Sequence, residues 1–82
     1  MNKRRSFIIG IKSFSLTVQE KDFLKKYKPW GVILFSRNIK SIKQTKKLTD
    51  DIKKIFNDRK YPILIDQEGG RITRLSKFRD TS

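Results

Sequence analysis

Three short apolar runs alternate with two segments of helical periodicity along this chain. The runs lie at residues 7–11, 31–35 and 63–65 and contain no charged residue. Runs of this length without polar alternation are typical of strands that are buried on both faces. The hydrophobic pattern therefore predicts three buried strands.

The two segments between these runs each begin with a capping box, formed by Thr17 and Glu20 in the first and by Ser41 and Gln44 in the second. In this motif the hydroxyl caps the helix and the longer side chain reaches back to the amide of the cap residue. The first helix is expected over residues 18–27, because Pro29 disfavours its continuation. The second is expected over about four turns from residue 42, where apolar residues recur every three or four positions.

The order strand, helix, strand, helix, strand predicts an α/β fold with parallel strands joined by right-handed crossovers. Buried parallel strands need helices over both faces of a sheet, or a closed barrel, and three strands cannot close a barrel. Residues 76–82 lose all periodicity. We therefore expect residues 1–82 to be an incomplete domain whose third strand exposes an unpaired edge, which favours aggregation when the chain is expressed alone.

Composition narrows the possible chemistry. The chain has no cysteine and no histidine, which excludes thiolate nucleophiles, cysteine-ligated metals and the commonest general base. The apolar run near the N-terminus is too short for a signal peptide or a membrane span. Chemistry must therefore rest on carboxylates, Lys, Arg, Ser, Thr or Tyr.

The net charge of +13 on 82 residues suggests a binder of nucleic acid or another anionic polymer. The lysines, however, are spread along the whole chain and do not form one arginine-rich patch with interleaved aromatic residues. That distribution favours a solvated surface. A small basic α/β module that binds an anionic polymer remains the alternative function.

Polar residues follow the second and third apolar runs directly. Arg37 and Asn38 come just after residues 31–35, and Asp66 follows residues 63–65. In parallel α/β folds ligands bind at the carboxyl ends of the strands, so polar residues at these positions are candidates for a binding site.

The segment after the third run contains further candidates: Glu68, Gly69, Gly70, Arg71 and Arg74. Asp66 and Glu68 could suggest the acid and nucleophile of a glycosidase, but that mechanism needs its carboxylates on opposite sides of the cleaved bond. Glu68 could instead pair with an arginine and hold the loop. The glycines permit a turn with positive φ, and the arginines offer planar forks of donors. Nucleotide-binding fingerprints are absent.

Two motifs, GVILFSRN at residues 31–38 and ILIDQEGGRITRL at residues 63–75, resemble the N-terminal part of the family 3 glycoside hydrolases. The resemblance is closest to the bacterial β-N-acetylglucosaminidases, or β-N-acetylhexosaminidases, of cell-wall recycling. It covers nearly the whole chain from residue 7. It implies that residues 1–82 form the first βαβαβ portion of an incomplete (β/α)8 TIM-type barrel.

The resemblance also implies a division of roles. Asp66 and Arg74 would bind N-acetylglucosamine, supported by Arg37, Glu68, Gly69, Gly70 and Arg71. The nucleophile and the histidine acid/base of a retaining mechanism would lie beyond Ser82, so the chain alone is expected to be inactive. The chain is expected to bind no cofactor, metal, membrane or nucleic acid. The location implied is cytoplasmic. A separately encoded remainder of the barrel is a possible partner.

Overall fold

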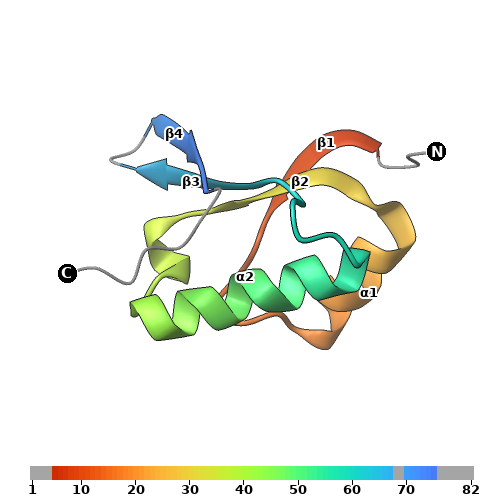
Figure 1. Ribbon diagram of the computed structural model, residues 1–82, viewed down its shortest axis with the longest axis horizontal. Helices are drawn as coiled ribbons and strands as arrows, with labels where there is room; N and C mark the ends of the chain where they lie inside the picture. The colour runs from red at the N-terminus through yellow and green to blue at the C-terminus, as the bar shows by residue number, and fades with distance from the viewer. Residues whose placement is uncertain (1–4, 68–69, 76–82) are drawn as a thin grey trace.

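The structure, a computed structural model, describes residues 5–67 and 70–75 (Figure 1). Its elements are, in order, β1 (Arg5–Gly10), α1 (Val18–Tyr27), β2 (Pro29–Leu34), the short 3₁₀ helix η1 (Ser36–Asn38), α2 (Ile42–Phe56), β3 (Ile63–Gln67) and β4 (Arg71–Arg74). The three strands and two helices expected from the sequence are all present. The 3₁₀ helix and the fourth strand were not expected.

Both capping boxes form as predicted. The Glu20 amide donates to Thr17 Oγ1 at 3.0 Å, and the Thr17 amide donates back to Glu20 Oε1 at 2.9 Å. Ser41 and Gln44 repeat the exchange at 3.1 and 3.3 Å. These side chains satisfy amides that have no partner inside the helix, so each helix begins where the sequence predicts.

The sheet has the strand order β1-β2-β3-β4. The first three strands are parallel, as predicted, but β4 is antiparallel to β3. The expectation of an unpaired edge on the third strand is therefore wrong. Gly70 has φ 147°, which glycine adopts readily, and an antiparallel neighbour needs only a tight turn rather than a crossover helix.

Both helices cover the same face of the sheet (Figure 1). The sequence left two arrangements open for the buried strands, helices over both faces of a sheet or a closed barrel, and in the described part of the chain the helices cover one face only. Strands added in the order β1, β2, β3 by right-handed crossovers place every crossover helix on one side. On the other face, Ile8 of β1 and Ile72 of β4 are exposed.

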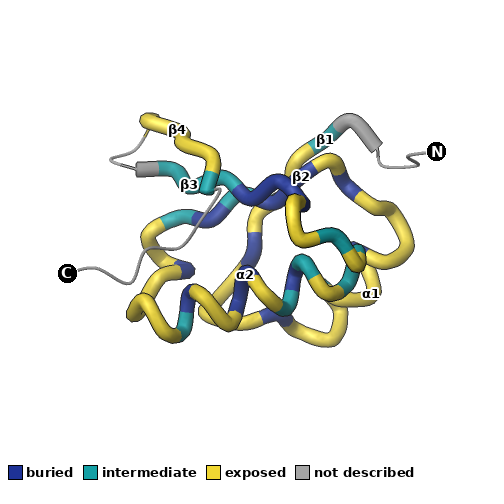
Figure 2. The backbone as a smooth tube through the Cα atoms, in the orientation of Figure 1, coloured by how far each residue is buried: buried dark blue, intermediate teal, exposed yellow. Residues whose placement is uncertain are grey.

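The hydrophobic core lies between the sheet and the two helices (Figure 2). Its buried members are Ile11, Leu16, Leu24, Val32, Leu34, Leu48, Ile52, Tyr61 and Ile63. Tyr61 stacks on Phe56 at 4.0 Å between ring centroids, and its hydroxyl donates to the Pro29 carbonyl at 2.7 Å. That contact joins the start of β2 to the segment that leads into β3.

Candidate functional site

The carboxyl ends of the three parallel strands lie along one edge of the sheet. Asp66 belongs to β3 itself, and Arg37 and Asn38 belong to η1, which follows β2 directly. The structure therefore places the candidate residues of the second and third strands on the same edge, as the sequence predicts.

Asn38 is buried at this edge, where its side chain bonds to the backbone. Its side chain is fully buried and makes three hydrogen bonds to backbone. Oδ1 accepts from the Phe35 amide at 2.8 Å, while Nδ2 donates to the Ile11 carbonyl at 2.9 Å and to the Ser13 carbonyl at 2.8 Å. Asn38 therefore joins the segment after β2 to the segment after β1, a role that its position in the sequence did not reveal.

Arg37 lies across the ends of the same two strands. Its Nη2 donates to the Ile11 carbonyl at 3.1 Å, and its guanidinium lies 4.8 Å from the centroid of the Phe35 ring. A Cβ at Gly10 would approach that ring to 3.3 Å, so glycine lets the ring and the guanidinium pack closely over β1. The residue remains exposed, and so it presents positive charge at this edge.

Asp66 is half-buried near the end of β3. Its Oδ1 accepts a hydrogen bond from the Gly70 amide at 2.8 Å. The carboxylate therefore stabilises the turn into β4, in addition to any role in binding. A loop-holding role for Glu68 is one of the alternatives that the sequence left open, but Glu68 and Gly69 lie outside the described residues.

The structure does not bring Arg74 to Asp66. Arg74 is paired with Leu64 in the sheet, whereas the partner of Asp66 is Ile72. Nη2 of Arg74 donates to the Lys60 carbonyl at 3.0 Å, close to the amino end of β3. Arg71, at the start of β4, is exposed.

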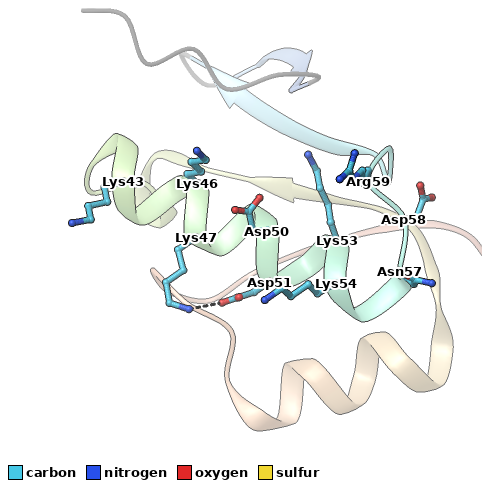
Figure 3. A pocket seen from close by; sticks show the side chains of 10 residues that line it. All are labelled: Lys43, Lys46, Lys47, Asp50, Asp51, Lys53, Lys54, Asn57, Asp58 and Arg59. Atoms are coloured by element: carbon cyan, nitrogen blue, oxygen red, sulfur yellow. Dashed lines mark hydrogen bonds and ion pairs between the residues drawn. The ribbon is translucent and has the colours of Figure 1, made fainter.

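A hollow of about 570 Å³ lies elsewhere, along the exposed side of α2 and the following loop (Figure 3). It is lined by Lys43, Lys46, Lys47, Asp50, Asp51, Lys53, Lys54, Asn57, Asp58 and Arg59. Carboxylates are interleaved with the cations, and Lys47 Nζ lies 3.2 Å from Asp51 Oδ2. This mixture is typical of a solvated helix face.

Within residues 5–67 and 70–75, no three acidic side chains gather closely enough to hold a metal ion. In the same part of the chain, no helix has the length and apolar character needed to cross a membrane.

No protein-family model matches the chain, but individual proteins do. It is 37% identical over 76 residues to a β-hexosaminidase of Psychromonas ingrahamii, a match that covers 93% of this chain and 21% of that protein. A β-hexosaminidase of Neisseria meningitidis serogroup A is 44% identical over 71 residues, covering 87% of this chain and 19% of the relative.

Comparison with solved structures leads to the same group of proteins. The crystal structure of NagZ from Neisseria gonorrhoeae in complex with N-trifluoroacetyl-D-glucosamine superposes with a TM-score of 0.70 at 39% identity, over 87% of this chain and 21% of that one. The chain thus spans about a fifth of the length of the relatives it matches. In sequence and in backbone it is a β-hexosaminidase-like segment, which confirms the resemblance predicted from its motifs.

Proposed function

We propose that this chain is part of a family 3 β-N-acetylhexosaminidase and supplies part of the sugar pocket. The whole enzyme would remove terminal β-linked N-acetylglucosamine with retention, in cytoplasmic recycling of the cell wall. The observation that carries the proposal is Asp66 near the carboxyl end of β3, within a segment 39% identical to a relative solved with N-trifluoroacetyl-D-glucosamine.

The chemistry of Asp66 suits a sugar. An ionised carboxylate offers about four acceptor positions, and the Gly70 amide uses one of them. The others can accept from a pair of sugar hydroxyls, as charge-assisted hydrogen bonds. Arg37 places a cation at the same edge, whereas Arg74 would have to exchange the Lys60 carbonyl for the substrate.

The proposal is tested in a chimera in which this chain replaces the matching segment of the N. gonorrhoeae relative. Hydrolysis of 4-nitrophenyl N-acetyl-β-D-glucosaminide is then compared for Asp66→Asn and the parent chimera. Asparagine still accepts from the Gly70 amide, so the turn is kept while the charge is lost. Loss of two charge-assisted bonds, at about 1.5 kcal/mol or more each, lowers kcat/KM by about 100-fold.

Asp22→Asn is the matched control, because Asp22 is an exposed carboxylate on α1, which carries none of the candidate residues. The proposal fails if the two variants hydrolyse the substrate equally well, or if the chimera is folded and inactive. The 82-residue chain by itself is expected to release no 4-nitrophenol, since the nucleophile and the acid/base are expected beyond Ser82. Turnover by the purified chain would contradict this part of the proposal.

A further inference from the structure

A hollow of about 590 Å³ lies between the segment that follows β1 and the first part of α2. Phe14 lines it from one side, and Lys40, Lys43 and Leu48 line it from the other. Its volume is within the range of small-molecule sites in proteins, about 300–1,000 Å³. We call it the Phe14 hollow.

The two sides of the Phe14 hollow are joined by the side chain of Gln44. Its Nε2 donates to the Phe14 carbonyl at 2.7 Å and to the Asn38 carbonyl at 2.9 Å. Its Oε1 accepts from the Lys40 amide at 2.7 Å, and the same side chain completes the capping box of α2. A ligand would therefore enter a preformed site and lose little free energy in ordering it.

The Phe14 hollow has an apolar part that water can reach. The Phe14 side chain is 42% exposed, and Leu48, a member of the core, also lines the hollow. A flat apolar group that covers the phenyl ring would remove this surface from water, which is favourable. The hollow therefore favours a ligand with an aromatic or aliphatic body.

The charged side chains of the Phe14 hollow favour an anion. Lys40 Nζ lies 5.9 Å from the centroid of the Phe14 ring, so one small ligand could contact both. The Asp51 carboxylate also lines the hollow, but it is already paired with Lys47 at 3.2 Å (Figure 3). In the described part of the chain, Lys40 and Lys43 have no ion-pair partner. Their charges are therefore available to a carboxylate of the ligand.

We propose that the Phe14 hollow binds a small amphipathic carboxylate. The apolar body of the ligand would lie on Phe14 and Leu48, and its carboxylate would lie beside Lys40 and Lys43. This inference is independent of the proposed function, because the residues that line the hollow include none of the candidate sugar-binding residues.

The test is a titration of the isotope-labelled chain with 2-naphthoate, which carries a flat apolar body and one carboxylate, followed by NMR. The backbone amide signals of Phe14 and Leu48 and the side-chain amide signals of Gln44 are expected to shift together. The expected Kd is about 1 mM, the affinity that the efficiency of typical ligands gives for a molecule of this size. The neutral 2-naphthamide should bind about threefold more weakly, because it lacks the charge.

Two substitutions separate the apolar contact from the charge. Phe14→Ala removes the ring and should weaken the binding of 2-naphthoate about fivefold. Lys40→Gln should weaken it about threefold and leave the binding of 2-naphthamide unchanged. The matched controls are Phe23→Ala and Lys25→Gln, at an exposed aromatic residue and an exposed lysine of α1, and both should keep the Kd of the parent chain.

Three results would overturn the inference. The first is that the signals of Phe14, Leu48 and Gln44 stay in place at about 10 mM 2-naphthoate, well above the expected Kd. The second is that 2-naphthamide binds as tightly as 2-naphthoate. The third is that a control variant on α1 weakens binding as much as Phe14→Ala does.

Discussion

Replacing Asn38 with alanine tests whether its buried side-chain amide stabilises the segments at the carboxyl ends of the strands, where the candidate site lies. Asn38→Ala removes the acceptor of the Phe35 amide and the donor to two carbonyl oxygens in the segment after β1. Because the side chain is fully buried, water cannot replace these bonds without opening the structure.

The magnitude follows from the three bonds. At about 1 kcal/mol each, their loss costs about 3 kcal/mol, and more if the backbone groups stay buried without partners. At about 0.05–0.15 kcal/mol per residue, a chain of 82 residues has a total stability of about 4–12 kcal/mol. The side-chain amide of Asn38 thus accounts for a large part of the free energy of unfolding.

The assay is urea denaturation followed by the helical circular dichroism signal. With m near 1–1.5 kcal/mol/M, as for small domains, the midpoint should fall by about 2–3 M. Ser36→Ala is the control, since Ser36 is exposed on the same 3₁₀ helix and its backbone bond to the Ile39 amide is kept. If Asn38→Ala is unfolded in buffer, both variants are compared in trimethylamine N-oxide, which strengthens burial. Midpoints of the two variants within about 0.5 M of each other would refute the anchoring role.

Substitutions at three further positions test separate features, each by urea denaturation. Gly70→Ala is expected to cost about 1 kcal/mol or more, because φ 147° is strained for alanine; an unchanged midpoint would contradict this. Tyr61→Phe should lose about 1 kcal/mol with the bond to the Pro29 carbonyl, and equal stability would mean that the hydroxyl contributes nothing. Glu20→Ala should cost about 1 kcal/mol, whereas Glu20→Gln, which keeps an acceptor, should cost less; equal losses would argue against its capping role.

The features that the sequence predicts well are local. Both helices begin at capping boxes whose two members lie three residues apart, so the pattern contains the whole interaction. β4 escaped prediction because its four residues, RITR, include a single apolar position, Ile72, and their pairing with β3 depends on a turn. The placement of both helices on one face depends on the order of the strands, which no local pattern encodes.

The candidate site also combines features that are encoded locally with features that depend on distant residues. Asp66 could be located from the end of an apolar run, and the structure places it near the carboxyl end of β3. The role of Asn38 could not be predicted from the sequence. Its side chain donates to the carbonyls of Ile11 and Ser13, which lie 27 and 25 residues away along the chain. The separation of Arg74 from Asp66 depends on the register of β4, which the sequence alone does not determine.

The candidate residues differ in whether their present hydrogen bonds are compatible with binding a sugar. Asp66 is oriented by an amide four residues away, and Arg37 by a carbonyl at the end of β1, so this segment orients both without a partner. Arg74 is exposed and bonded to the Lys60 carbonyl. If Arg74 binds sugar, its hydrogen bond to the Lys60 carbonyl must be given up. Asp66 would then bind sugar while keeping its bond to the Gly70 amide, whereas Arg74 would have to exchange its present partner for the sugar.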